Sequence, residues 1–456
     1  MGKSRGHLGG ILGVILLIGC QHSTKTPHVA TPDAGEVSAN PKRDGRKSLA
    51  DTEARGLCLA DPRGASALDD ELRAQQRQVK AAPRNSEGWV LIGRAWVHKA
   101  RAASDPGFYL NVAGCADTAL RVEPGNLAAL NLNALTLMND HKFAQARQAA
   151  EEILRQEPQN TVALAILSDA FLELGHFGEA ASAAQQLVDF RPDMASYSRA
   201  SYFRWLQGDT ENAKLLVRAA LSAGRDRRHP EPTAWTLVQA GMLWWNEGNY
   251  TEADTLFTEA LKWMPEYPAA LVGRAQVALS RHQPQPAITW LEKAYRLSQL
   301  PATAWLLGDA RQMSGDEGGA QAAYKQVVQE GRKSDRLTLA LFYAAKNIAN
   351  AEALRLIETE RAGRGGIYVE DAYAWVLYRA GKIAEAQAAS ERARSLGTQD
   401  ARLLYHAGAI RLAAGDRTGQ QLIEKALLLN PQFDWSSVTE AKKVLSAYGN
   451  KKSFDS

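Results

Sequence analysis

The 456-residue sequence has little net charge and few cysteines, and each shortage excludes a class of function. Its 54 Lys and Arg residues nearly balance its 50 Asp and Glu residues, which leaves a formal net charge of +4. Nucleic-acid binding needs basic residues clustered on one face, so we expect no nucleic-acid partner. Three cysteines occur without a CxxC pair or a Cys/His spacing suited to zinc, so we also expect no metal site.

Catalytic motifs are lacking as well. No histidine is followed by glutamate, which excludes an HExxH zinc site, and no GxxxxGK(S/T) phosphate-binding loop occurs. His141, His176 and His282 lie near expected turns between helices, and they fit turn residues better than ligands. The sequence therefore predicts that the chain is no enzyme and holds no cofactor.

Residues 1–20 read as an export signal. Lys3 and Arg5 precede an apolar run over residues 8–18, which is typical of a secretory leader and too short to span a membrane comfortably. The run ends in LIGC, which resembles the lipobox of bacterial lipoproteins. That resemblance implies cleavage before Cys20, lipidation of Cys20 and anchoring in a membrane. Gln21 in the next position favours the outer membrane, facing the periplasm, and a plain leader with an incidental cysteine is the alternative.

The next segment, residues 21–50, is polar and rich in Pro, Ser, Thr and Gly, so we expect a flexible tether there. Cys58 and Cys115 are the two cysteines that remain once Cys20 is lipidated. An exported compartment permits a disulfide between them. The alternative is that both are small apolar side chains buried in helices.

The rest of the chain is periodic. Pro124, Pro158 and Pro192 are evenly spaced, and glycines in turn-like settings follow at positions 175, 208, 248, 315, 381 and 415. The glycine intervals are close to the proline spacing or to twice that spacing. The interval between Gly208 and Gly248 is the exception, because it carries an insertion. A period of about 34 residues indicates a helix–turn–helix repeat.

Residues 241–265 (GMLWWNEGNYTEADTLFTEALKWMP) show the unit most clearly. Its spacing resembles the tetratricopeptide (TPR) repeat at eight positions: Gly241, Trp244, Gly248, Tyr250, Ala253, Phe257, Ala260 and Pro265. Gly241 and Ala253 allow two helices to approach closely. Gly248 ends the first helix in a left-handed conformation, and Pro265 stops the second.

The resemblance implies an all-α fold, a right-handed α-solenoid of about ten TPR-like helix pairs over residues 86–433. We expect the unit at residues 336–364 to be degenerate. Residues 51–85 read as an N-terminal helical cap, and residues 434–456 as a C-terminal capping helix and tail. Stacked helix pairs form a superhelix with a concave groove, which the first helices line.

Two adjacent tryptophans point to that groove. Neighbours on a helix lie about 100° apart, so Trp244 fills the wedge inside its repeat and Trp245 turns toward the groove. Nine residues in related positions form the predicted partner-binding stripe: Tyr202, Trp205, Val238, Met242, Trp245, Trp305, Trp375, Tyr378 and Tyr405. Exposed aromatic patches usually mark contact with a partner. The alternative is that adjacent repeats bury these rings against each other.

The function that the resemblance implies is a lipid-anchored scaffold of the cell envelope, which binds a protein or peptide partner through its groove. One alternative is an envelope lipoprotein that captures a small ligand or short peptide. Another is a non-catalytic regulatory subunit of a cell-wall or glycan enzyme. Residues 51–85 and 434–456 are too short for a catalytic domain of their own.

Overall fold

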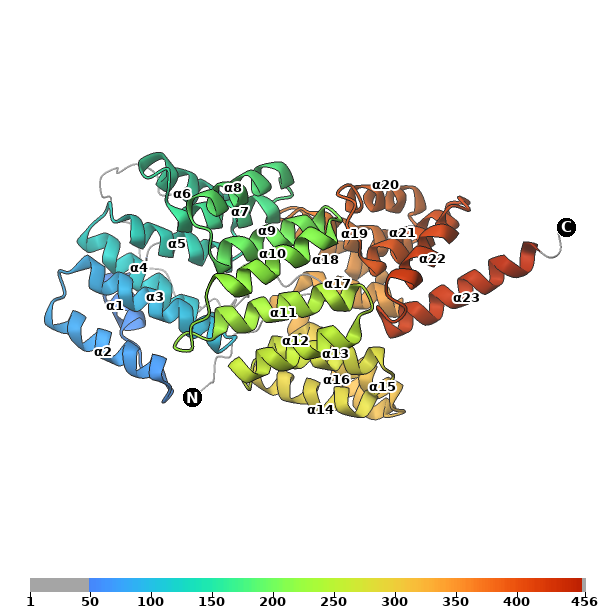
Figure 1. The fold of residues 1–456 in the computed structure, drawn as a ribbon, viewed down its shortest axis with the longest axis horizontal. Coiled ribbons are helices and arrows are strands. Elements are labelled where there is room, and N and C mark those ends of the chain that lie inside the picture. Colours follow the sequence, from blue (N-terminus) through green and yellow to red (C-terminus); the bar gives the residue numbers. More distant parts are fainter. Residues whose placement is uncertain (1–48, 453–456) are drawn as a thin grey trace, which may run out of the picture.

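The computed structural model describes residues 49–452, so the leader, Cys20 and the tether up to residue 48 lie outside the described residues. The described part folds into 23 α-helices and one 3-10 turn (Pro106–Phe108), with no strand among them. The prediction of an all-α helical repeat solenoid is confirmed (Figure 1). Within the same range, no helix combines the length and the apolar character needed to cross a membrane.

Ten consecutive helix pairs make up the body. The first helices are α3 (Ser86–Ala102), α5 (Leu127–Asn139), α7 (Thr161–Glu173), α9 (Met194–Leu206), α11 (Glu231–Asn246), α13 (Pro268–Ser280), α15 (Pro301–Met313), α17 (Arg336–Lys346), α19 (Ile367–Arg379) and α21 (Ala401–Ala413). The second helices are α4 (Tyr109–Val122), α6 (Phe143–Gln156), α8 (Phe177–Phe190), α10 (Thr210–Ala223), α12 (Tyr250–Trp263), α14 (Pro284–Leu297), α16 (Glu317–Ser334), α18 (Asn350–Arg361), α20 (Ile383–Ala393) and α22 (Gly419–Leu429). Helices α1 (Asp51–Cys58) and α2 (Ala67–Ala81) precede the pairs, and α23 (Trp435–Lys452) follows them.

The turn inside each helix pair needs a residue in the left-handed backbone conformation, with positive φ. All six glycines picked out by the period have positive φ, between 74° and 84°. Three repeats put another residue in the equivalent turn, with His141 at φ 54°, His282 at 57° and Asn347 at 52°. Asn and His are among the side chains that tolerate this region best. The degenerate unit at residues 336–364 therefore still forms a helix pair, α17 and α18.

Small residues and one ring set the spacing between helices of the repeat at residues 241–265. The ring of Phe257, on α12, lies between Gly241 of α11 and Gly273 of α13. A Cβ at either glycine would come within 2.5 Å of that ring. Phe257 is fully buried, with Ala253 and Ala260 one turn away on the same face of α12. The close approach expected at Gly241 is therefore present in the structure.

A disulfide closes the N-terminal end. It joins Cys58, at the end of α1, to Cys115, in the middle of α4. The Trp96 indole Nε1 and the Gln76 side-chain Nε2 both donate to the Cys58 carbonyl, at 3.0 and 3.2 Å. Buried Cys58 therefore holds α1 to α4 through the disulfide, and to α2 and α3 through its carbonyl.

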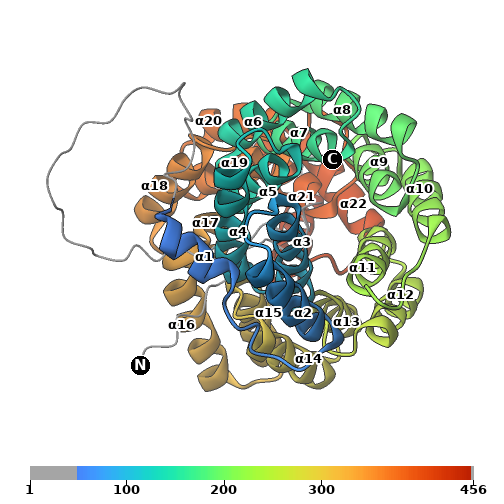
Figure 2. The same ribbon diagram turned by 90° about the vertical axis from the view of Figure 1, so that its left-hand side faces the viewer.

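The helix pairs wind into a tight superhelix. In Figure 1 the pairs advance along the long axis from α1 to α23, and Figure 2, which looks along that axis, shows them passing around a ring. Hydrogen bonds join residues 185 to 194 positions apart, such as Ser298 to the Ser104 carbonyl. Since a repeat of this kind spans about 34 residues, one turn takes between five and six repeats.

Three linkers of the second turn dock onto the ends of three first helices in the turn before. We call this line of contacts the seam. It is made by three hydrogen bonds: Gly365 N–H to the Glu173 carbonyl (2.7 Å), the Thr398 hydroxyl to the Leu206 carbonyl, and Asn430 Nδ2 to the Trp245 carbonyl (2.7 Å). The accepting carbonyls lie at the C-terminal ends of α7, α9 and α11, where helical partners run out. The Trp245 carbonyl also accepts the Gly248 N–H at 2.9 Å, so the seam supplies partners for the Glu173 and Leu206 carbonyls while it fixes the pitch.

Candidate binding cavity

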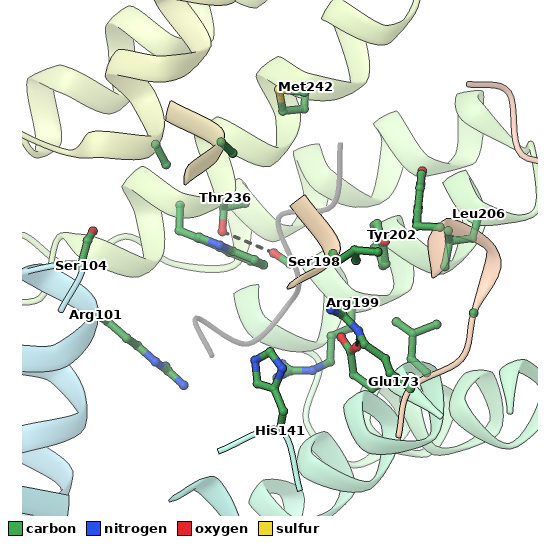
Figure 3. A pocket seen from close by; sticks show the side chains of 18 of the residues that line it. Arg101, Ser104, His141, Glu173, Ser198, Arg199, Tyr202, Leu206, Thr236 and Met242 are labelled. Atoms are coloured by element: carbon green, nitrogen blue, oxygen red, sulfur yellow. Dashed lines mark hydrogen bonds and ion pairs between the residues drawn. The ribbon is translucent and has the colours of Figure 1, made fainter. Parts of the chain in front are cut away.

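Inside the superhelix lies a cavity of about 870 Å³. Its wall comes from the inner faces of α7, α9, α11 and α13, and from loops of both turns, including residues 104–106 and 364–367. Figure 3 shows Arg101 reaching in from the α3 side, with Glu173, Arg199 and Tyr202 on the wall formed by α7 and α9. The space is a consequence of the tight winding, because residues far apart in the sequence face each other across it.

The cavity wall includes apolar and aromatic side chains. Tyr202, Trp235, Met242 and Leu337 are among them. A short polar contact is set into the wall, since the hydroxyls of Ser198 on α9 and Thr236 on α11 are 3.3 Å apart (Figure 3). Apolar walls with a few placed polar groups are typical of binding sites.

Ion pairs also line the cavity wall. The Arg199 guanidinium binds the Asp169 carboxylate at 2.8 Å, and Arg364 binds Glu173 at 2.5 Å. The side chains of both pairs are at most 13% exposed. Burial raises the pKa of Glu231, which accepts a hydrogen bond from the Tyr267 hydroxyl at 3.2 Å. Pairing of this kind is what makes buried charges tolerable, so these residues hold the wall in shape.

Two acceptors on the wall have no hydrogen-bond partner within the described part of the chain. They are Oε1 of Gln276, on α13, and Oδ2 of Asp335, between α16 and α17. Gln276 is 5% exposed and Asp335 is 8% exposed. Over residues 49–452, no three His, Cys, Asp or Glu side chains gather as a metal ion would require. The wall is thus equipped to hold a ligand by hydrogen bonds and ion pairs.

Two segments of the chain, residues 131–195 and 238–300, match the family model described as tetratricopeptide repeat. The chain carries tetratricopeptide repeats. The matched segments contain all of α7 and α13 and the second half of α11, so they supply part of the cavity wall, whereas Ser198, Arg199 and Trp235 lie outside them. Such repeats are typical of protein-interaction scaffolds, and in general they are not catalytic. No curated protein sequence matches the chain.

Several solved TPR-like structures are similar to this chain at low identity. PilW, a widely conserved type IV pilus biogenesis factor, is 16% identical over 47% of this chain and 97% of its own, with a TM-score of 0.39. Pseudomonas aeruginosa pilF is 16% identical over 48% and 96%, with a TM-score of 0.37. The human IFIT1 dimer with PPP-AAAA is 13% identical over 83% and 95%, with a TM-score of 0.46. No functional conclusion follows from similarity at this level.

The structure divides the predicted partner-binding stripe, beginning with its residues on α9 and α11. Tyr202 and Met242 line the cavity. Trp205 and Trp245 are 3% and 8% exposed and lie under the second turn. Trp205 stacks on Tyr368 of α19, with ring centroids 6.1 Å apart, and the Trp245 indole donates to Ser280 Oγ at 3.1 Å. Both indoles therefore pack within the chain.

The remaining stripe residues also pack within the chain. Val238 is fully buried in α11, and half-buried Trp305 meets Phe342 edge to face at 5.4 Å. Trp375 and Tyr405 are at most 2% exposed, and half-buried Tyr378 lies 5.0 Å from Trp375. Burial against other repeats is the alternative that the sequence left open. The binding role of the stripe stays a prediction.

Near Trp375 lies a polar pair that sequence reasoning passed over. The His406 ring stacks on Trp375 at 4.0 Å, and its Nδ1 lies 2.9 Å from the Asp371 carboxylate. Both side chains are at most 6% exposed, so the pair is part of the packing between α19 and α21.

Sequence reasoning also missed the second-turn side of the cavity. No motif in the sequence marks residues 363–366 (GRGG) as part of a site, and Asp335 carries no signal beyond its place before a helix. Both reach the cavity because the chain comes back to the same side of the superhelix after one full turn. No motif in the sequence specifies how many repeats make up that turn. The segment between α3 and α4, which includes Ser104 and Asp105, also lines the cavity.

Proposed function

We propose that this chain is a non-catalytic, lipid-anchored scaffold of the cell envelope that holds a segment of a partner protein in its central cavity. In this proposal Cys20 carries the lipid anchor in the outer membrane, and the repeats face the periplasm. The observation that carries the binding role is the 870 Å³ cavity, enclosed by first helices of TPR pairs. Tight winding removes most of the open groove, so a partner would contribute a short segment rather than a long helix.

Support for a protein partner comes from the repeats themselves, because solenoids of this type present concave surfaces to other proteins. Lipid anchoring rests on the LIGC sequence at residues 17–20 and on the basic, then apolar, leader before it. One observation favours a second candidate, the capture of a free small ligand. The cavity volume falls within the roughly 300–1,000 Å³ of small-molecule pockets.

Site-directed photo-crosslinking tests the binding role. A photoreactive phenylalanine replaces Trp235, which lines the cavity, or Leu215, which is 59% exposed on α10 outside it. The proposal expects a crosslinked partner protein from position 235 and none from position 215, in cells that make the chain naturally. Ala269→Trp, which fills part of the cavity, should abolish the product. Equal crosslinking from both positions would remove the cavity as the site.

The anchor has a separate test. Mass spectrometry of the purified chain should find acyl groups on Cys20 at the new N-terminus, and Cys20→Ser should release the chain from the membrane fraction. Retention of an uncleaved leader in the wild-type chain would contradict the lipoprotein assignment without affecting the cavity.

A further inference from the structure

Asp335 combines a structural role with an unused acceptor. One carboxylate oxygen, Oδ1, accepts the Thr338 backbone N–H at 2.9 Å and so caps the start of α17. The other, Oδ2, is buried at the cavity wall without a hydrogen bond of ordinary geometry from the described residues, and the buried Thr338 hydroxyl, which also lacks such a bond, lies near the carboxylate. A buried polar atom without a partner destabilises the folded state, and a charged one does so more strongly. An occupant of the cavity that donates to Oδ2 would remove this penalty.

The charges around Asp335 leave it short of a counterion. Arg364 is the nearby cation, and it interacts with three carboxylates, those of Glu173, Glu360 and Asp335. Arg364 already binds Glu173 at 2.5 Å and Glu360 at 3.5 Å. One guanidinium against three carboxylates gives a local formal charge of 1 − 3 = −2. A cation at Asp335 would complete this group.

The excess of negative charge is also found over the whole lining of the cavity. Six carboxylate residues line it: Asp105, Glu173, Asp193, Glu231, Asp335 and Glu370. Four arginines line it: Arg101, Arg199, Arg364 and Arg392. With His141 neutral, the lining carries a formal charge of 4 − 6 = −2, whereas the whole chain carries +4. A concave, partly apolar site of one sign concentrates ligands of the other sign.

We propose that the cavity selects a partner segment with a lysine or arginine side chain, and that the Asp335 carboxylate receives its cation. This inference rests on the proposed function, and it names the chemistry of the partner. The apolar wall at Tyr202, Trp235, Met242 and Leu337 suits the aliphatic stem of such a side chain. A bare metal ion would leave that wall without a contact.

Calorimetric titration of the full-length chain tests the inference with two tripeptides. The probes are acetyl-Ala-Lys-Ala-amide and its norleucine counterpart, which keeps the stem and lacks the cation. We expect the lysine peptide to bind the wild type at least tenfold more tightly than the norleucine peptide. Asp335→Asn keeps the capping oxygen and the volume, and it should reduce this preference to less than threefold.

A matched control is available in Asp316. It caps α16 through the Gly319 N–H, as Asp335 caps α17, and it does not line the cavity. Asp316→Asn should keep the full lysine preference. An unchanged preference in Asp335→Asn, or wild-type binding of neither peptide, would overturn the inference. Cadaverine is a diamine that lacks a peptide backbone. If it binds as tightly as the lysine peptide, the occupant is a small amine, and the inference of a peptide segment is wrong.

The two proposals can fail separately. If position 235 crosslinks a partner protein while Asp335→Asn keeps the lysine preference, the charge selection is wrong and the scaffold role stands. If no partner crosslinks while the lysine preference depends on Asp335, the cavity binds cations and the scaffold role is wrong.

Discussion

The Arg364 guanidinium and the Glu173 carboxylate form a buried ion pair although 191 positions separate them in the chain. Glu173 ends α7 in the first superhelical turn, and Arg364 lies in the linker between α18 and α19 in the second. The same linker donates the Gly365 N–H to the Glu173 carbonyl at 2.7 Å. One residue of the first turn is therefore held twice by the second, and this double contact lies beside the cavity.

Breaking this pair should loosen the seam. Glu173→Gln removes the closest carboxylate partner of the buried Arg364, and removal of one member of a buried pair typically destabilises by about 3–5 kcal/mol, with the lower end expected here because Glu360 stays 3.5 Å away. We expect a loss of that order in the free energy of unfolding, measured by urea denaturation. Hydrogen exchange of residues 363–367 should accelerate in the variant, because these residues are held by the seam.

The control for this change is an ion pair of the same type on the surface. Lys382 and Glu385 are 3.3 Å apart with side chains 44% and 55% exposed. Glu385→Gln should change stability by less than about 1 kcal/mol, since exposed pairs contribute little. If the two variants lose equal stability, the seam is not held by the buried pair.

A methyl group at Gly241 should be poorly tolerated. A Cβ there would meet the Phe257 ring at 2.5 Å, and the ring cannot move away because Gly273 confines its other side. Overpacking of this kind destabilises by roughly 1–3 kcal/mol. Thermal unfolding of Gly241→Ala should show the loss, whereas Gly318→Ala, which has open space around it in α16, should be neutral or stabilising. A neutral Gly241→Ala would contradict the wedge role of Phe257.

Local features of the fold followed from the sequence because each repeat carries its own signals. The glycine turns and the helix ends depend on residues within one repeat, and the Phe257 wedge depends on one repeat and the first helix of the next. Even the degenerate unit forms a helix pair, since Asn347 adopts the left-handed turn conformation that glycine adopts elsewhere.

The pitch of the superhelix did not follow, and the cavity depends on it. Each repeat is rotated slightly relative to the one before it, and these rotations add up over five or six repeats before Asn430 contacts the Trp245 carbonyl. No short sequence motif specifies the total rotation. The same limit explains the aromatic stripe. Trp245 occupies a groove-facing position in the repeat, as expected, and the next turn then covers it. Tyr202 and Met242 line the cavity instead.

The disulfide should stabilise the N-terminal end in particular. Cys58 and Cys115 are 57 positions apart, and closing a loop of this size restricts the unfolded chain by about 4 kcal/mol on the chain-entropy estimate. Reduction, or Cys115→Ser, should therefore destabilise α1 to α4 first, because the bridge joins α1 to α4 at one end of the stack and repeat stability is largely a sum of local terms. Hydrogen exchange with and without reductant measures this. Equal acceleration in α1–α4 and in α19–α22 would contradict a local effect.

Stability should depend on pH through Asp335. Burial raises the pKa of Asp335 to about 6, above the 3.8 of an unperturbed side chain. Between pH 4 and 6 the folded chain therefore holds a proton that the unfolded chain releases, so stability from this group falls as pH rises across that window. A pKa difference of this size corresponds to about 3 kcal/mol at neutral pH. Asp335→Asn keeps the cap without the charge, so it should be more stable than wild type by up to this amount at pH 7.5.

The two proteins should become equally stable near pH 4, where the Asp335 carboxyl is neutral in wild type. Urea denaturation at pH 4, 5, 6 and 7.5 measures the difference, and Asp316→Asn, at an exposed cap, should stay within about 1 kcal/mol of wild type throughout. A constant difference between Asp335→Asn and wild type over this range would mean that Asp335 titrates normally. A saturating lysine peptide should shrink the difference at pH 7.5, because its cation stabilises the same carboxylate that burial disfavours.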